Sequence, residues 1–218
     1  MKREIITTKD GSTSLFIPEW NETYHSKHGA IQEAYHVFIK NGLSIFNGKS
    51  VSILEIGFGT GLNAFITSLE ADKSNVEVNY TAVEAFPLTI EEIDAMNFAS
   101  KIDSNKADTF SAIHQLNWEV KNQVSDNFYL TKRNQFFQDV NDKECFDIIY
   151  FDAFSYDVQP ELWSEAIFTK MHTALKTNGI LVTYACRTII KQTMISAGFR
   201  VEKLPGAPGK REMLRAYK

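Results

Sequence analysis

The sequence predicts an α/β fold built on a mainly parallel β-sheet. From residue 49 onward, short apolar segments of strand length alternate with segments of helical periodicity, a pattern typical of repeated β-then-α units. A glycine-rich segment with Gly57, Gly59 and Gly61 separates one such strand from the helix that follows. In α/β folds a turn of this kind lies at the carboxyl edge of the sheet, where ligands bind.

The composition is that of one globular domain. The chain has 218 residues, of which 44% are hydrophobic and 23% charged. We expect a single domain over residues 1–218, with an N-terminal hairpin and covering helix in residues 1–48 and the sheet-forming core in residues 49–218. Apolar runs such as Ile148 to Phe151 have strand length, and the first residues lack a signal-peptide pattern. We therefore expect no membrane association and a cytoplasmic location.

The N-terminal elements precede the main sheet. Two β-rich stretches, residues 4–8 and 13–17, flank Asp10-Gly11, a dipeptide suited to tight turns, and they predict a β-hairpin. Residues 29–40 carry apolar side chains at helical spacing and are followed by Asn41-Gly42, a stop signal. This segment predicts a helix that covers the main fold.

The core is predicted to alternate between strands and helices. Apolar, β-rich segments indicate strands at residues 51–55, 76–84, 128–131, 146–151 and 179–185. Helical periodicity indicates helices at residues 62–69, from about residue 88, and at residues 109–116, 160–175 and 188–197. A closing antiparallel pair is predicted for residues 199–204 and 213–217, so the mainly parallel sheet ends in a C-terminal antiparallel hairpin.

The spacing of the glycines favours one cofactor class. A dinucleotide-binding turn has Gly or Ala at the sixth position from Gly57, where this sequence has Leu62, and the Gly-Lys-Ser/Thr of a P-loop is absent. The remaining pattern, E-x-G-x-G-x-G, resembles the first motif of the class I S-adenosylmethionine-dependent methyltransferases, whose core is Rossmann-like. The resemblance implies S-adenosylmethionine as cofactor, with a binding set of Glu55, Gly57, Phe58, Gly59, Gly61, Leu62 and Asn63.

Acidic residues after later strands extend this candidate site. Glu84 ends the strand at residues 76–84, where a carboxylate accepts hydrogen bonds from ribose hydroxyl groups; a solvated strand end is the alternative. Asp152 follows the strand at residues 146–151, so we expect it on the same edge of the sheet as the glycines. Asp139 is a candidate contact for the adenine amine.

Motifs along nearly the whole chain resemble the methyltransferase domain of the bacterial MnmC family. In chain order they are Tyr24-His25-Ser26, Gly29-Ala30, Glu33, His36-Val37-Phe38, Glu55 to Asn63, Phe86 to Thr89, Asp152-Ala153-Phe154, Pro160 to Trp163, Gly179 to Tyr184, Ala197-Gly198-Phe199 and Lys210-Arg211-Glu212-Met213. Members of this family transfer a methyl group from S-adenosylmethionine to the exocyclic amine of 5-aminomethyl-2-thiouridine at the tRNA wobble position. Bifunctional members also carry a flavin-dependent oxidase domain. Because this sequence ends after the Lys-Arg-Glu-Met segment, the expected form is the stand-alone methyltransferase.

The resemblance directs hypotheses about the acceptor side of the site. We hypothesise that Asp152 is catalytic: its carboxylate orients the acceptor amine through a charge-assisted hydrogen bond and helps to accept a proton. The expected substrate-binding residues are Tyr24, His25, Phe154 and Tyr184 around the flipped-out base, with Lys210 and Arg211 on phosphates. The expected partner is the tRNA anticodon stem-loop, with a functional link to the enzymes that make the aminomethyl-uridine intermediate.

Charge is distributed unevenly along the chain. From Cys186 onward there are 8 basic and 2 acidic residues, against 15 basic and 25 acidic residues before it. The basic C-terminal part is an expected surface for a polyanion, and the alternative is a set of solvated charges on a terminal helix and hairpin. Cys145 and Cys186 are too few and too far apart for a zinc site, so we expect no metal and two buried thiols.

Three other functions are compatible with parts of the pattern. An aminopropyl or other small-molecule amine transferase shares the glycine loop and an acidic residue near Asp152. A non-catalytic module that binds S-adenosylmethionine or RNA would keep the loop, although intact Glu55 and Asp152 favour catalysis. A dehydrogenase is disfavoured by Leu62 at the sixth position of the glycine motif.

Overall fold

The N-terminal part of the chain forms a small sheet of its own. The computed structural model describes residues 2–218. An antiparallel three-stranded sheet has the order β1-β2-β3, with β1 (Glu4–Thr7), β2 (Thr13–Ile17) and β3 (Glu22–Thr23). The carboxylate of Asp10 in the first turn accepts hydrogen bonds from the amides of Ser12 (3.0 Å) and Ile31 (3.1 Å). Asp10 thereby joins the hairpin to the start of the covering helix.

The large sheet has eight strands in the order β10-β11-β9-β8-β4-β5-β7-β6. The five central strands, from β9 to β7, pair in parallel, whereas β11 pairs antiparallel with both β9 and β10, and β6 pairs antiparallel with β7. The strands are β4 (Ser50–Ile56), β5 (Glu77–Val83), β6 (Lys121–Ser125), β7 (Phe128–Arg133), β8 (Phe146–Phe151), β9 (Leu175–Thr183), β10 (Arg200–Pro205) and β11 (Glu212–Tyr217). The predicted α/β fold with a C-terminal antiparallel hairpin is confirmed.

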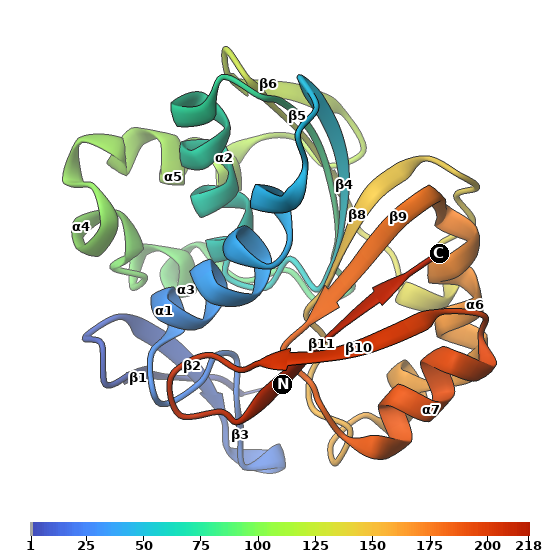
Figure 1. Ribbon diagram of the computed structural model, residues 1–218. Helices are drawn as coiled ribbons and strands as arrows, with labels where there is room; N and C mark the ends of the chain where they lie inside the picture. Colours follow the sequence, from blue (N-terminus) through green and yellow to red (C-terminus); the bar gives the residue numbers. More distant parts are fainter. Residues whose placement is uncertain (1) are drawn as a thin grey trace.

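Helices cover both faces of this sheet (Figure 1). α1, α2 and α5 lie on one face, and α6 and α7 lie on the other. The α-helices are α1 (Ala30–Ala34), α2 (Leu62–Ser74), α3 (Ile90–Asp94), α4 (Phe98–Ile102), α5 (Ala107–Gln115), α6 (Glu165–Ala174) and α7 (Thr188–Ser196). The other helical turns are η1 (Pro18–Trp20), η2 (Tyr35–Lys40, a π-helix), η3 (Leu43–Ile45), η4 (Ser104–Lys106), η5 (Phe137–Asp139) and η6 (Pro160–Trp163).

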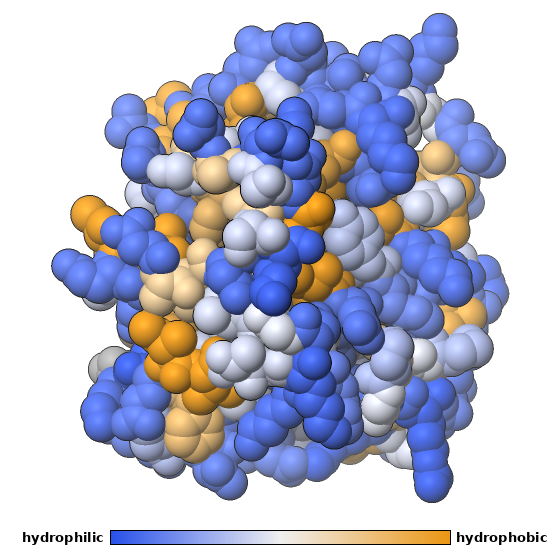
Figure 2. Space-filling view, turned by 90° about the vertical axis from the view of Figure 1, so that its left-hand side faces the viewer, coloured by the Kyte–Doolittle hydropathy of each residue, from blue (hydrophilic) through white to orange (hydrophobic). Residues whose placement is uncertain are grey.

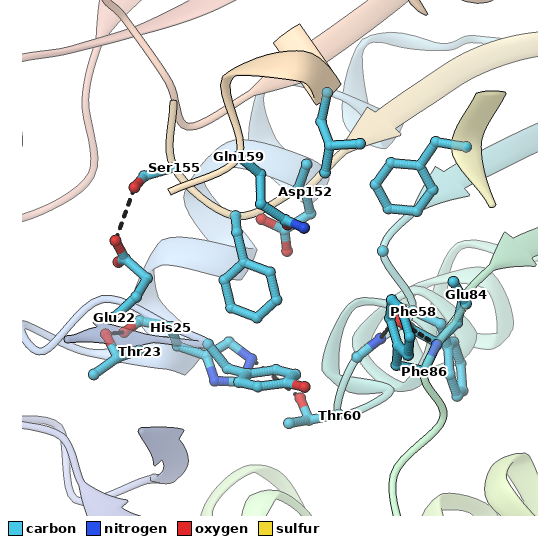
Figure 3. A pocket seen from close by; sticks show the side chains of 18 of the residues that line it. Glu22, Thr23, His25, Phe58, Thr60, Glu84, Phe86, Asp152, Ser155 and Gln159 are labelled. Atoms are coloured by element: carbon cyan, nitrogen blue, oxygen red, sulfur yellow. Dashed lines mark hydrogen bonds between the residues drawn. The ribbon is translucent and has the colours of Figure 1, made fainter. Parts of the chain in front are cut away.

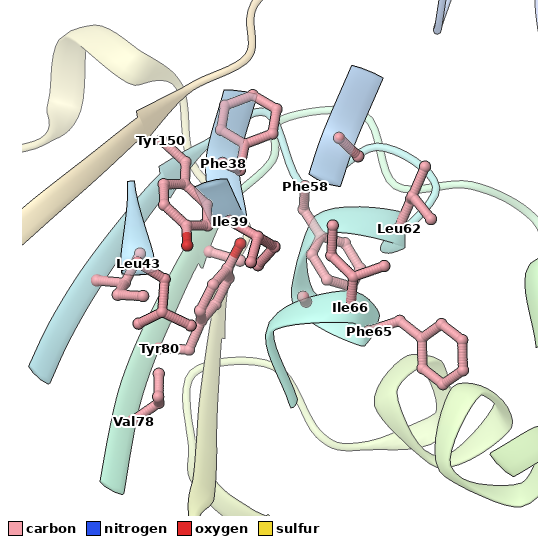
Figure 4. Close-up of a cluster of buried hydrophobic side chains, with 14 of the residues drawn as sticks. Phe38, Ile39, Leu43, Phe58, Leu62, Phe65, Ile66, Val78, Tyr80 and Tyr150 are labelled. Carbon is pink, nitrogen blue, oxygen red and sulfur yellow. The ribbon is translucent and has the colours of Figure 1, made fainter. Parts of the chain in front are cut away.

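The alternation of side chains along β4 explains the two cores. Ile53 faces α2 together with Tyr80 and Tyr150, while the neighbouring Leu54 faces α6. Figure 4 shows Tyr80 and Tyr150 within the core on the α2 side, and their ring centroids lie 6.0 Å apart. Because Glu55 is two residues after Ile53, this period places the carboxyl group on the α2 face, where the side chain is fully buried.

The structure differs from the sequence prediction in a few segments. The helix predicted for residues 160–175 is divided into η6 and α6, and β9 begins at Leu175. Leu175 is fully buried and pairs with Phe146 of β8, so strand pairing overrides the helical pattern there. The patterns also missed β3, β6 and α4. The expectation of two buried thiols was wrong, because Cys145 is exposed and Cys186 is half-buried.

The surface of the described part is mixed in character. Figure 2 shows the face that lies on the left of Figure 1, and hydrophilic side chains cover most of it, with apolar ones in small groups. No helix within residues 2–218 combines the length and the apolar character that a membrane span requires.

Candidate cofactor and acceptor site

A cavity of about 340 Å³ opens where β4, β5 and β8 end. Its size is within the ~300 to 1,000 Å³ range of small-molecule sites. Figure 3 shows the carboxylate of Asp152 pointing into this space, with Glu84 and Phe86 on another side of it. Since these side chains follow different parallel strands, the sheet itself brings them to one edge, as the sequence predicted.

The glycine loop between β4 and α2 is tied to its neighbours by backbone contacts. The amides of Gly57 and Phe58 donate to the carbonyl oxygen of Val83, at 3.0 and 3.2 Å. Gly57 has a φ of +91°, and a Cβ atom at this position would lie 2.6 Å from the carbonyl oxygen of Asp152. Only glycine fits here, because any side chain would be strained and would collide with backbone. The loop therefore packs directly against the residue that follows β8.

Of the other residues predicted to bind the cofactor from this loop, some line the cavity and one does not. Phe58, Gly59 and Leu62 line the cavity. Gly61 does not line it: Gly61 is the N-cap of α2, with a φ of +71°, and a Cβ atom there would meet the His114 ring at 2.8 Å. The role of Gly61 is thus to let α2 begin at the loop, and the cofactor contact predicted for this residue is not supported by its position.

Glu84 holds the loop from the end of β5. Its Oε2 accepts a hydrogen bond from the Gly59 amide (3.0 Å), and its Oε1 accepts one from the Phe86 amide (2.8 Å). A carboxylate oxygen has two acceptor sites, so each oxygen keeps one for a ligand hydroxyl group. Glu84 lines the cavity, and the ribose contact predicted for this residue fits its position.

Asp152 and Asn63 meet at the inner end of the cavity. Asn63 lies in the first turn of α2, and its Nδ2 donates to Oδ2 of Asp152 at 2.8 Å. Burial raises the pKa of Asp152 to about 7, although the hydrogen bond from Asn63 opposes this shift. A carboxyl group with a pKa near neutrality is suited to accept a proton at pH 7. Two residues that the sequence assigned to different roles, cofactor binding and catalysis, are therefore direct partners.

Glu55 lies beneath the loop and does not line the cavity. Neither of its carboxyl oxygens has a hydrogen-bond partner within residues 2–218. Burial raises the pKa of Glu55 well above its ordinary value. The predicted direct contact with the cofactor is not supported by this position, since the side chain is enclosed by the protein core.

Aromatic side chains border the open end of the cavity. Phe86 and Phe136 are 53% and 48% exposed, and their rings form an edge-on pair with centroids 5.9 Å apart. Exposed aromatic rings at a cavity mouth suit a flat apolar group such as a purine. Asp139 is exposed and does not line the cavity, whereas its neighbour Gln138 does, so the position of Asp139 does not support the predicted adenine contact. Neither phenylalanine was predicted as a site residue, although Phe86 begins one of the family motifs and stands two residues after Glu84.

The N-terminal segment covers one side of the cavity through aromatic contacts. Tyr24 and Trp20 pack edge-on against Phe154, with centroid distances of 5.0 and 5.4 Å. Glu22 of β3 accepts a hydrogen bond from the Ser155 hydroxyl group at 2.8 Å. Both Tyr24 and Phe154 line the cavity, so the structure brings together these two predicted substrate-binding residues from distant parts of the chain.

His25 fastens the small sheet to the glycine loop. Its Nδ1 is hydrogen-bonded to the Ser14 hydroxyl group (2.9 Å), and its Nε2 to the Thr60 hydroxyl group (3.1 Å). Burial lowers the pKa of His25 to about 4, so the ring is neutral at pH 7. Because both ring nitrogens are hydrogen-bonded to the protein, His25 holds the small sheet against the glycine loop, and it also lines the cavity.

A second cavity of about 180 Å³ adjoins the first at Asp152, Asn63 and Tyr184. Lys210 lines it and forms an ion pair with Glu33, and its Nζ lies 4.1 Å from the centroid of the Tyr184 ring. The Lys210 ammonium therefore points inward, in contrast to the predicted contact with phosphates. Tyr184, another predicted substrate-binding residue, lines both cavities.

The basic residues of the C-terminal part are largely paired with acidic ones. Within residues 2–218 the pairs are Arg187–Asp157, Lys203–Glu212, Lys210–Glu33, Arg215–Glu202 and Lys218–Glu144. Arg211 is exposed and lines neither cavity. The pairing favours the alternative interpretation of the charge asymmetry, in which most of these charges serve the fold. Within residues 2–218, Lys191, Arg200 and Arg211 form no ion pair, and Arg211 is the one of these three that was predicted to contact phosphates.

The residues around the first cavity fit an adenosyl cofactor. Gly57 leaves no room for a side chain, Glu84 keeps acceptor sites for hydroxyl groups, and Phe86 borders the mouth with an apolar ring. No group of three or more His, Cys, Asp or Glu side chains is arranged to hold a metal ion in the part of the chain that the structure describes.

The sheet with β11 inserted antiparallel beside β9, and the glycine loop after β4, define a class I methyltransferase fold. A family model described as S-adenosyl-L-methionine-dependent methyltransferase matches residues 104–218, which is more than half of the chain. The chain belongs to this family, and its cofactor is S-adenosyl-L-methionine.

Several relatives of similar sequence are MnmC proteins. They are proteins named tRNA 5-methylaminomethyl-2-thiouridine biosynthesis bifunctional protein MnmC. The protein from Leptospira interrogans is 29% identical over 96% of this chain and 34% of its own length. The protein from Cupriavidus metallidurans is 27% identical over 96% and 33%, and that from Leptospira borgpetersenii is 30% identical over 89% and 32%. The resemblance to MnmC methyltransferase domains is confirmed, and the chain spans about a third of the length of these relatives.

Solved structures share the fold. The crystal structure of MnmC2 from Aquifex aeolicus matches with a TM-score of 0.71 and 21% identity, over 99% of this chain and 70% of that chain. A spermidine synthase in complex with the transition-state analogue AdoDATO matches with a TM-score of 0.56 and 15% identity, over 99% and 73%. Both likenesses support the Rossmann-like fold class.

Proposed function

We propose that this chain methylates the exocyclic amine of 5-aminomethyl-(2-thio)uridine at the tRNA wobble position, giving 5-methylaminomethyl-(2-thio)uridine. The observation that carries the proposal is the position of Asp152, a carboxyl group with a pKa of about 7 where the two cavities meet. One cavity fits the cofactor, and the other leads to an acceptor. The names of the MnmC relatives supply the acceptor class.

Asp152 has two tasks in this proposal. S-adenosylmethionine, when bound, supplies a methyl group on a positively charged sulfur. An aliphatic amine resembles lysine and is mostly protonated at pH 7, so it lacks the lone pair needed for attack. Asn63 occupies Oδ2 of Asp152, which leaves Oδ1 to orient the amine and to help accept its proton, directly or through water. Fixing the amine in line with the methyl group supplies much of the catalysis in such a reaction.

Aromatic side chains provide the surface for the base. Tyr24, Phe154 and Tyr184 surround the entrance to Asp152, and rings of this kind stack on unpaired bases in RNA recognition. The exposed position of Arg211 suits a contact with a phosphate group of the anticodon stem-loop. These residues extend the proposal from an amine to an amine carried on a nucleotide.

A small-molecule amine is the second candidate acceptor. The observation that favours it is the ion pairing of most C-terminal basic residues, which reduces the charge available to a polyanion. The fold shared with a spermidine synthase is compatible with such an acceptor. The two candidate acceptors differ in size: the entrance to Asp152 must admit a tRNA base in the first case and only a small amine in the second.

The test is methyl transfer from labelled S-adenosylmethionine to bulk tRNA taken from cells that lack this protein, followed by nucleoside mass analysis. The proposal predicts that 5-methylaminomethyl-(2-thio)uridine appears as the aminomethyl form disappears. Asp152→Asn should lose this activity, whereas the matched exposed variant Asp108→Asn should retain it. A protein that binds S-adenosylmethionine, leaves tRNA unmodified and methylates or otherwise alkylates polyamines would refute the tRNA proposal in favour of the second candidate.

A further inference from the structure

The second cavity carries more charge than a packing defect would. Carboxyl groups of Glu22, Glu33 and Asp152 line it, with the ammonium group of Lys210. The Glu22 carboxylate is engaged by the Ser155 hydroxyl group, and Glu33 is paired with Lys210. Charged groups of a cavity wall interact more strongly than they would in water, because the surrounding protein screens them less. Asp152 therefore experiences the balance of these charges.

The Glu33–Lys210 ion pair joins two distant parts of the chain at the second cavity. Glu33 comes from α1, and Lys210 comes from the loop between β10 and β11. The second oxygen of Glu33 accepts a hydrogen bond from the Ser26 amide at 3.3 Å. The Lys210 ammonium also lies over the Tyr184 ring, whose hydroxyl group donates to the carbonyl oxygen of Ala153 at 2.9 Å. The ion pair is thus held by Ser26 on the Glu33 side and by the Tyr184 ring on the Lys210 side. Tyr184 in turn contacts Ala153, the residue that follows Asp152.

We propose that Lys210 and Glu33 are positioning residues that act as an opposed charge pair on Asp152: Lys210 keeps Asp152 ionised for the acceptor amine, and Glu33 limits that effect. This inference rests on the proposed function for its catalytic consequence. It assigns to Lys210 an inward electrostatic role in place of a contact with tRNA phosphates.

The directions of the charge effects agree with this geometry. Burial raises the pKa of Asp152, the Asn63 hydrogen bond lowers it, Glu33 raises it and Lys210 lowers it. A cation beside the cavity also lowers the pKa of an incoming amine, which favours the neutral form that reacts. Five other titratable groups line the second cavity with Asp152: Glu22 of β3, His25 after β3, Glu33 of α1, Tyr184 after β9, and Lys210. Two more act on Asp152 from the core beneath it: Glu55 of β4 and Tyr80 of β5. His28 lies against Gly209, next to Lys210.

The experiment measures the acidic limb of the pH–rate profile under single-turnover conditions with saturating cofactor and tRNA. Lys210→Met leaves Glu33 unopposed, so we expect the limb to move up by about one pH unit, a roughly tenfold loss at pH 6.5 that recovers by about pH 9. Glu33→Gln should move it down. The double variant Glu33→Gln/Lys210→Met should return it to within about 0.3 units of the wild type. Lys203→Met is the matched control, because it removes a lysine from the exposed pair with Glu212 in the same hairpin.

A readout without tRNA separates this inference from the proposed function. The ¹³C signal of the Asp152 carboxyl carbon, identified by its loss in Asp152→Asn, is titrated in the full chain. We expect a midpoint near 7 in the wild type, higher in Lys210→Met and lower in Glu33→Gln. If the midpoints shift but no tRNA product forms, the charge pair stands and the proposed function fails. If tRNA is methylated while the limb and the midpoint stay unchanged, or if Lys203→Met shifts them equally, the charge-pair proposal is overturned.

Discussion

Replacing Asp152 with Asn should make the protein more stable while removing its activity. The carboxyl group of Asp152 has a pKa of about 7, against an ordinary value of 3.8, chiefly because it is buried. The folded state therefore binds this proton more tightly than the unfolded chain does. Stability that is present at low pH is lost as the pH rises from about 4 to about 7, and the full cost of the charge persists above that range. An amide at this position carries no such cost.

The size of the effect follows from the pKa shift. About three pKa units correspond to a ceiling of ~4 kcal/mol at 1.36 kcal/mol per unit. Asp152 is partly open to the cavity, and solvent screening reduces the expected gain to about 2 kcal/mol. For a chain of 218 residues this corresponds to a rise of about 4 to 8 °C in Tm. The amide oxygen of Asn can still accept the hydrogen bond from Asn63, so packing at the site is retained.

The assay is thermal unfolding of the wild type, Asp152→Asn and Asp108→Asn at pH 5 and pH 8. At pH 5 the wild-type carboxyl group is neutral in the folded protein but ionised in the unfolded chain, so part of the cost is already present and Asp152→Asn should gain less Tm than at pH 8, while Asp108→Asn stays near the wild type. At pH 8 only Asp152→Asn should gain Tm, with methyl transfer lost at both pH values. An Asp152→Asn protein that unfolds at or below the wild-type Tm at pH 8 would refute the view that burial of this charge opposes folding.

Other predictions follow from contacts around the glycine loop. Gly57→Ala should weaken S-adenosylmethionine binding at least tenfold in calorimetry and destabilise the fold by about 1 to 3 kcal/mol, because the new Cβ meets backbone at 2.6 Å. Glu84→Gln should weaken cofactor binding about tenfold with unchanged secondary structure by circular dichroism; unchanged affinity would exclude a ribose contact. Between pH 6.5 and pH 4 His25 should lower the unfolding free energy, since it stays neutral when folded, while Asp152 contributes with the opposite sign; His25→Gln should therefore change the pH dependence by about 1 to 2 kcal/mol toward greater stability at pH 4 in denaturant titrations. Arg211→Glu should lower tRNA affinity and reduce the salt dependence by about one phosphate contact, and an unchanged salt series would exclude that contact.

The cofactor side of the site could be predicted from local sequence because each feature is local. A strand that ends in alternating glycines forces a turn with positive φ, and an acidic residue directly after a buried strand lies at the carboxyl edge of a parallel sheet. Gly57, Glu84 and Asp152 were located by these rules and lie where they place them. Asp139 failed for an equally local reason. In the short turn η5 a shift of one residue exchanges a side chain outside the cavity for one that lines it, and no periodic pattern fixes that register.

The acceptor side depends on contacts between segments that are far apart in the sequence. No spacing rule pairs Glu33 with Lys210, because the contact exists only when the closing hairpin folds back over α1. The dual hydrogen bonding of His25 likewise requires the small sheet to be docked on the glycine loop. The sequence alone therefore predicts that Lys210 and Arg211 form a surface for nucleic acid, although Lys210 lines the second cavity.

Partly different segments of the fold line the two cavities. The parallel sheet belongs to a fold that also occurs in a spermidine synthase, and in this chain it brings the glycine loop, Glu84 and Asp152 to one cavity. The walls of the second cavity come largely from the N-terminal sheet, α1 and the β10–β11 loop, which lie outside the five central parallel strands. Changes in those segments alter the charge and shape of the second cavity, and changes in the N-terminal sheet also reach the first cavity, which Tyr24 and His25 line. Acceptor choice in this chain should therefore follow from the balance of Glu33 and Lys210 and from the rings of Tyr24 and Tyr184.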